Sequence, residues 1–217
     1  MNTVNTLRLT GLFKGPVPPV TIIGCGAIGS RLAVELTKLG VPSFTLYDDD
    51  TVSSHNICNQ AFTNAQVGMS KVTATKELIM ANGCSDVAIA EEKFTNQFAS
   101  GIVFLCVDSM SARKNIMKHL LRDMLHVTRV IETRMGIDEV RCYDVDRQRY
   151  NLWLSRSDYG DEHVEVSACG TSLAVGATAG LISSIATWMF MKPIMEKARD
   201  FEVIMSTDGF SVYVETP

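Results

Sequence analysis

The chain has 217 residues, of which 46% are hydrophobic and 20% are charged. These proportions are typical of a soluble globular protein, and they exclude an intrinsically disordered chain. The formal net charge of −4 argues against a broad nucleic-acid-binding surface, because such surfaces are normally basic.

The first half of the chain alternates short apolar runs with helical patterns. Val20–Gly24 is a predicted buried strand, Ala27–Gly40 an amphipathic helix, and Ser43–Asp48 a second strand. The further predicted elements are a helix at Lys71–Asn82, a strand at Asp86–Ala90, a short helix near Asn96–Ala99, a strand at Gly101–Val107, a helix at Ser111–Leu125 and a strand at Val127–Thr133. This alternation predicts an α/β fold with a Rossmann-like, doubly wound, mostly parallel sheet.

The pattern changes after Gly136. Glu139–Val145 and Leu152–Leu154 alternate as antiparallel strands do, and Phe201–Met205 and Phe210–Glu215 form a predicted hairpin. We therefore expect C-terminal antiparallel strands. We expect one domain over residues 1–217, with a Rossmann-like core at 18–135 and an extension at 136–217.

One long apolar segment lies within this extension. Ser172–Met191 has nearly no charge, is about as long as a membrane span, and contains the helix-packing pattern Gly176-x-x-x-Gly180. Its Thr and Ser residues favour a buried core helix or a dimer helix over a membrane span. Trp153 and Trp188 are most simply core residues.

The cysteines and the amino terminus bear on the compartment. Six cysteines without a CxxC pair predict free thiols and no zinc site. Met1–Thr10 has no signal-peptide pattern, so a reducing cytoplasm is the expected location.

A glycine-rich turn joins the first strand to the first helix. It reads Gly24-Cys25-Gly26-Ala27-Ile28-Gly29, which is GxGxxG. The first glycine allows a tight turn, the second lets backbone amides approach a phosphate, and the third lets the helix pack on the strand. The helix N-terminus adds partial positive charge. This context predicts a nucleotide site, although a tight turn without a ligand is the simpler alternative.

An acidic residue ends the second strand. Asp48 follows Gly29 at the distance expected of an acid that binds ribose hydroxyls. A NAD-dependent oxidoreductase is the generic prediction from these two features. The alternative is that Asp48, Asp49 and Asp50 form a solvated acidic turn.

The segments that follow carry a more specific pattern. Asp48-Asp49-Asp50-Thr51-Val52 leads to Asn56-Ile57-Cys58-Asn59-Gln60 and then to Val67-Gly68-Met69-Ser70-Lys71; Cys106-Val107-Asp108-Ser109 and Arg113 come later. Over about residues 18–135 this combination resembles the ThiF/MoeB/HesA family, the adenylyltransferases related to ubiquitin-activating enzymes. The dehydrogenase hypothesis does not explain the segments Asn56–Gln60 and Val67–Lys71.

The resemblance implies a reaction and its partners. Members of this family join a carboxylate to the α-phosphate of ATP, releasing pyrophosphate. The carboxylate is usually the C-terminal glycine of a ubiquitin-like or sulfur-carrier protein. The expected cofactors are ATP and Mg²⁺, and the expected assembly is a homodimer. We expect neither nucleic acid nor a membrane as a partner.

The resemblance also implies roles for single residues. Asp48 is expected to hold the ribose, and Lys71 and Asn56 to reach the phosphates. Asp108 is expected to bind Mg²⁺ or position the metal-bound phosphates. The full set of expected nucleotide contacts is Gly24, Gly26, Ala27, Ile28, Gly29, Asp48, Asp50, Asn56, Gln60 and Lys71. The alternatives are a helix cap for Asp108 and an exposed helix lysine for Lys71.

Four residues leave the mechanism open. Asn59 stands where the family usually has an arginine, and arginine offers phosphate a charged fork that asparagine does not. Arg8 and Arg31 are candidate cations in its place, Arg8 by reaching the site of a partner subunit. Cys169 precedes the apolar helix and is a candidate acceptor of the activated carrier, or simply a packing residue. A catalytically degenerate module that binds nucleotide or protein is therefore the alternative to an enzyme.

Overall fold

A computed structural model describes residues 4–9, 11–160 and 175–216. Its centre is a single sheet of eight strands in the order β3-β2-β1-β4-β5-β6-β7-β8. The strands are β1 (Val20–Ile23), β2 (Phe44–Tyr47), β3 (Val87–Ala90), β4 (Gly101–Leu105), β5 (Val127–Met135), β6 (Glu139–Val145), β7 (Glu202–Ser206) and β8 (Ser211–Glu215). The expected α/β architecture is confirmed.

The first five strands are parallel and the last three are antiparallel. Val20 at the start of β1 pairs with Phe44 of β2 and with Ile102 of β4. The chain therefore moves outward in both directions from β1 and β4. In open α/β sheets, ligands bind at the carboxyl ends of the strands where the order reverses, which here is between β1 and β4.

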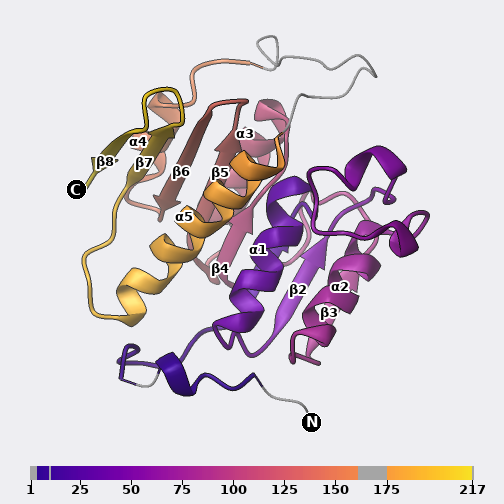
Figure 1. Ribbon diagram of the computed structural model, residues 1–217. Helices are drawn as coiled ribbons and strands as arrows, with labels where there is room; N and C mark the ends of the chain where they lie inside the picture. The colour runs from indigo at the N-terminus through magenta and orange to yellow at the C-terminus, as the bar shows by residue number, and fades with distance from the viewer. Residues whose placement is uncertain (1–3, 10, 161–174, 217) are drawn as a thin grey trace.

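Helices cover both faces of the sheet (Figure 1). One face carries α1 (Ala27–Lys38), α2 (Lys71–Ala81) and α5 (Gly176–Ile194), and its core includes Ile22 and Phe104. The other face carries α3 (Met110–Lys118), its π-helical continuation η4 (His119–Asp123) and α4 (Tyr150–Ser155). Short 3-10 turns lie at η1 (Leu7–Leu9), η2 (Ser54–Asn56) and η3 (Asn64–Gln66).

Two predictions of secondary structure are wrong. The segment near Asn96–Ala99 is irregular rather than helical, although buried Phe94 and Ala99 pack against the second face as a helix would. Leu152–Leu154 belongs to helix α4. Its alternating leucines are both 40% exposed, while Trp153 is buried beside Tyr150, three residues earlier on the same helix face.

Helix α5 packs along α1, and its inward residues join the core. Ser183 Oγ donates to the carbonyl oxygen of Ile28 (3.2 Å), and Thr187 Oγ1 donates to Glu35 (3.0 Å). Trp188 is 54% exposed on the outer side of α5, so its predicted place in the core is wrong. In the part of the chain that the structure describes, no helix has the length and apolarity needed to cross a bilayer.

A buried charge network ties the parallel strands to the second helical layer. Glu132 of β5 has no exposed surface, and it accepts hydrogen bonds from Arg113, from Arg134 Nε (2.9 Å) and from Trp153 Nε1 (3.1 Å). The Arg134 guanidinium also lies over the ring of Tyr143, 4.5 Å from its centroid. Each buried charge therefore has a partner, which burial requires.

We expect Glu132→Gln to lower the free energy of unfolding by about 3–5 kcal/mol, because two buried guanidinium groups lose their shared counter-charge. Chemical denaturation measures the change. Glu139→Gln is the matched control: it breaks a half-exposed pair with Arg141 in β6, and such pairs contribute at most about 1 kcal/mol. Equal stability of the two variants would contradict this role for Glu132.

Candidate functional site

The glycine loop lies between the end of β1 and the start of α1. Gly24 has φ +93°, a left-handed conformation that favours glycine. A Cβ atom at Gly24 would lie 2.8 Å from the carbonyl oxygen of Cys106, so the loop also packs directly on the end of β4. A Cβ at Gly29 would lie 1.9 Å from the carbonyl oxygen of Gly24. These two glycines are therefore needed for the close packing of strand, turn and helix.

Gly26 differs from its neighbours. A Cβ at this position would meet no atom within 4 Å in the described chain, and the residue is the N-cap of α1 without any side-chain cap. The first amides of a helix have no partner within the helix, and they attract anions. The open side of the loop is thus suited to a phosphate.

Asp48 contacts the glycine loop directly. Its Oδ2 accepts from the backbone N–H of Cys25 (2.6 Å), and its Oδ1 accepts from that of Asp50 (2.9 Å). Burial raises the pKa of Asp48, and the two N–H donors partly oppose that shift. Carboxylate oxygens of Asp48, Asp49 and Asp50 all lie within 4.8 Å of one another. Only Asp49 and Asp50 are exposed, so the solvated-turn alternative does not describe Asp48.

Lys71 is a buried cation at the start of α2. Its side chain is 10% exposed, and its Nζ donates to Oδ2 of Asp50 (2.7 Å), a carboxylate that is itself 66% exposed. The backbone N–H of Lys71 donates to the carbonyl oxygen of Asp50 (2.9 Å). Ser70 caps the helix. The alternative of an exposed helix lysine is therefore wrong.

The loop between β2 and α2 has its own internal support. Asn56 Oδ1 accepts from the backbone N–H of Ser53 (2.9 Å) and closes a capping box around η2. Gln60 is buried, and its Oε1 accepts no hydrogen bond from the described residues. The backbone N–H of Ala61 donates to Ser30 Oγ in α1 (3.0 Å), which fixes this loop against the first turn of the helix.

Asp108 follows β4 and is exposed. The N-cap of α3 is Ser109, whose side chain accepts from the N–H of Ala112, so the helix-cap alternative for Asp108 is wrong. Arg113 does not face the loop. It is buried and donates to Glu132 and to the carbonyl oxygens of Val107 and Thr133, so it holds the strand end that carries Asp108.

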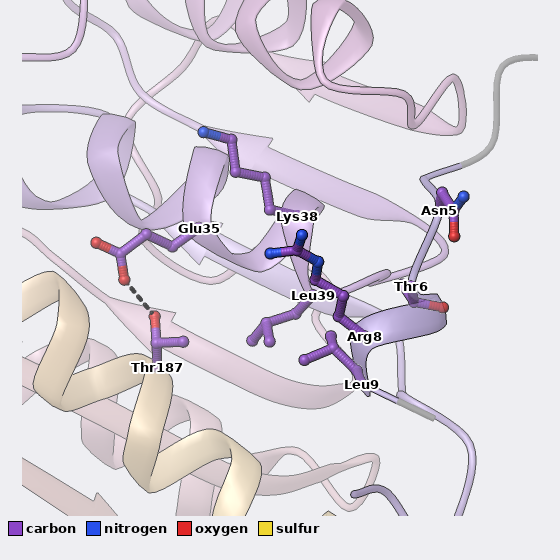
Figure 2. A pocket seen from close by; sticks show the side chains of 8 residues that line it. All are labelled: Asn5, Thr6, Arg8, Leu9, Glu35, Lys38, Leu39 and Thr187. Atoms are coloured by element: carbon purple, nitrogen blue, oxygen red, sulfur yellow. Dashed lines mark hydrogen bonds between the residues drawn. The ribbon is translucent and has the colours of Figure 1, made fainter. Parts of the chain in front are cut away.

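The remaining two candidates lie elsewhere. Arg8 is at the carboxyl end of α1 with Lys38 and Leu39, as Figure 2 shows. The 12 residues of α1 span roughly 18 Å, so Arg8 is far from the glycine loop of its own subunit. Cys169 lies outside the described residues.

One contact in this region was not predicted. Nε of Arg31, on α1, donates to the carbonyl oxygen of Asn59 (3.3 Å). Both residues stood out in the sequence, but their contact depends on how the loop folds back on the helix. The sequence signals were that Arg31 lies two residues after Gly29 and shares a helix face with Ala27, four residues earlier.

The glycines give a direct test of the loop geometry. We expect Gly29→Ala to lower the free energy of unfolding by about 3 kcal/mol or more, because its Cβ overlaps a backbone oxygen. Gly26→Ala is the control and should cost about 1 kcal/mol or less. Thermal and chemical unfolding measure both variants. Similar losses in the two would show that the loop is packed differently.

Comparisons with known proteins agree with this arrangement. The model of the ThiF family matches residues 18–203. Ubiquitin-like modifier-activating enzyme 5 of Culex quinquefasciatus is 32% identical over 116 residues, which cover 45% of this chain and 29% of that protein. The chain spans less than a third of the length of the first curated relatives that it matches.

Solved structures share the fold. PaaA superposes with a TM-score of 0.71 at 20% identity, covering 92% of this chain and 64% of that chain. E. coli MccB with ATP gives a TM-score of 0.70 at 16% identity, covering 97% and 66%. MccB has also been solved in complex with N-formylated MccA. Because the family match extends over most of the sequence and the fold agrees with it, the chain belongs to the ThiF family.

Proposed function

We propose that this protein is an adenylyltransferase that activates a carboxylate with ATP. A carboxylate oxygen attacks the α-phosphorus, the bond from that phosphorus to the bridging oxygen of the β-phosphate breaks, and pyrophosphate leaves. The product is an acyl-adenylate. We propose as substrate the C-terminal glycine of a small ubiquitin-like or sulfur-carrier protein.

The environment of Lys71 carries this proposal. A nearly buried ammonium group lies at the start of α2, and its partner Asp50 is largely exposed and lies two residues after Asp48. A dinucleotide site of the dehydrogenase kind needs the glycine loop and an acid such as Asp48, and it has no use for this cation. A triphosphate does, because charge develops on the departing pyrophosphate and must be stabilised.

The other residues take roles consistent with this chemistry. The amides at Gly26–Gly29 face the phosphates, and Asp48 accepts from ribose hydroxyls. Asn56 and Gln60 support the phosphate side of the loop. Asp108 is an exposed carboxylate at the end of β4, which fits a hard cation such as Mg²⁺. When bound, Mg²⁺ would neutralise phosphate charge.

We also propose a homodimer, in the cytoplasm. Trp188 exposes more than half of its surface on the outer face of α5, which is unusual for such a large aromatic residue and suits a subunit contact. In a dimer, Arg8 of one subunit would approach the site of the other. Cys169 stays a candidate acceptor for the activated carrier.

Asn59 favours a second candidate function. Without an arginine at this position, the protein would bind nucleotide or a partner protein without turnover. The two functions differ in one measurable property, which is exchange of labelled pyrophosphate into ATP in the presence of a carboxylate substrate.

We expect binding of Mg·ATP, followed by pyrophosphate exchange with a ubiquitin-like protein that ends in glycine or with a short peptide. Lys71→Ala and Asp108→Ala should each lower the exchange rate by about 100-fold or more. The first removes a cation that would stabilise charge on the phosphates, and the second removes the carboxylate that would hold Mg²⁺. Lys76→Ala on the same helix and Asp86→Ala before β3 are matched controls and should keep the wild-type rate.

The outcomes separate the candidates. Binding of Mg·ATP without exchange, for any carrier, favours the non-catalytic module. Stabilisation of the protein by NAD⁺ and not by Mg·ATP would contradict the adenylyltransferase proposal and support the dehydrogenase hypothesis instead.

The raised pKa of Asp48 predicts how nucleotide affinity depends on pH. On acidification Asp48 takes up a proton at a higher pH than an ordinary aspartate, and its neutral form binds ribose hydroxyls less well. Affinity should therefore fall before other carboxylates titrate. The stability of the free protein should not fall with it, because protonation relieves the cost of a buried charge. Calorimetric titration of adenosine, which has no phosphate that titrates at about pH 6, measures this at a series of pH values. Asp48→Asn should bind adenosine weakly and lack this loss of affinity on acidification.

A further inference from the structure

The nucleotide site of this chain has a different set of cations from the family pattern. Asn59 occupies the usual arginine position, and Arg113 is buried against Glu132 and two carbonyl groups. Lys71 supplies an ammonium group, which lacks the planar fork of an arginine. A guanidinium group near Asn59 would supply the missing charge, and Arg31 is half-buried at that place.

The helix directs Arg31 toward the carboxyl edge of the sheet. Arg31 lies four residues after Ala27, so the two share one face of α1. Side chains on a helix lean toward its N-terminus, which here is the phosphate-binding end. The contact with the carbonyl oxygen of Asn59 uses only Nε. The guanidinium group carries four further N–H donors on its two Nη atoms.

The start of α5 shows how far this side chain extends. A Cβ at Gly176 would lie 3.2 Å from Nη2 of Arg31 and 2.9 Å from the carbonyl oxygen of Cys58. Ser183, seven residues later on α5, contacts Ile28 in the first turn of α1. Seven residues of helix span about 10 Å. Because α1 and α5 run in the same direction, the Arg31 guanidinium lies beyond the first turn of α1, at the end of the helix that carries the glycine loop.

We propose that Arg31 supplies from α1 the phosphate-binding guanidinium that position 59 lacks. This inference rests on the proposed binding of ATP. The backbone carbonyl of Asn59 holds Nε, and the absence of a side chain at Gly176 leaves room for the Nη groups. The guanidinium group therefore comes from α1 instead of the loop after β2, and it lies at the same end of the sheet.

A purely structural role for Arg31 makes a different prediction. If Arg31 only tied residues 58–61 to α1, its loss would weaken all nucleotides alike and lower stability. If it binds the phosphate chain, its loss weakens Mg·ATP and leaves AMP nearly unaffected.

The test is calorimetric titration of Mg·ATP and AMP into the full chain and its variants. We expect Arg31→Ala to weaken Mg·ATP by about 10- to 100-fold, the usual effect of losing a charge-assisted hydrogen bond, and to change AMP affinity by less than about twofold. Arg31→Lys should be intermediate, because it keeps the charge and loses the fork. Lys38→Ala, at the other end of α1, is the matched control and should bind both nucleotides as the wild type does.

A second variant tests the replacement itself. Adding Asn59→Arg to Arg31→Ala should restore Mg·ATP affinity, and a folded double variant that stays weak would overturn the inference. Equal loss of AMP and Mg·ATP in Arg31→Ala would also overturn it, as would unchanged Mg·ATP affinity. If the wild type binds no Mg·ATP, the proposed function itself fails and the inference falls with it, so the two failures are distinct.

Discussion

The helix α1 reaches its place on the sheet only because Gly29 has no side chain. Any Cβ there would overlap the carbonyl oxygen of Gly24, so the helix would be pushed away from the strand that precedes it. Three further contacts depend on that position. All three are hydrogen bonds. Asp48 accepts from the N–H of Cys25, Ser183 of α5 donates to the carbonyl oxygen of Ile28, and Ser30 Oγ accepts from the N–H of Ala61. A single steric constraint thus aligns the glycine loop, Asp48 and the covering helix.

The site also depends on charges that never face it. Arg113 donates to the carbonyl of Val107, the residue before Asp108, and it is itself held by Glu132 deep in β5. Glu132 in turn binds Arg134 and Trp153. The position of the Asp108 carboxylate at the end of β4 is therefore set by a buried network that joins β5 to helices α3 and α4. An arginine that belongs to the family pattern acts here by positioning a strand end.

The sequence predicted those parts of the molecule that depend on local pattern. The glycine loop, the parallel strands and the C-terminal hairpin each follow from a short run of residues, and each was found at or near its expected bounds. Errors arose where tertiary packing decided the outcome. Leu152 and Leu154 alternate as in a strand, but the burial of Trp153 beside Tyr150 selects a helix. Trp188 reads as a core residue by its size alone, yet it faces outward.

The candidate site shows the same division. Asp48 was predicted from its spacing after the glycine loop, and Lys71 and Asp108 from the resemblance to the family. The pairing of Lys71 with Asp50 and the contact of Arg31 with Asn59, in contrast, required the fold. Both contacts join residues more than 20 positions apart through the irregular loop after β2. No periodicity encodes how such a loop returns to the sheet, because its conformation depends on individual caps and hydrogen bonds.

The cysteines differ in burial, and this difference allows one thiol to be labelled selectively among those that the structure describes. Cys25 and Cys142 are buried and burial raises the pKa of each thiol, while burial raises the pKa of Cys106 to about 11. Thiolates are the reactive species, so these three are poor targets for alkylation. Cys58 is exposed, and its carbonyl oxygen adjoins Gly176 at the start of α5. Among the described thiols, a maleimide fluorophore would therefore select Cys58 and place an optical reporter beside Arg31.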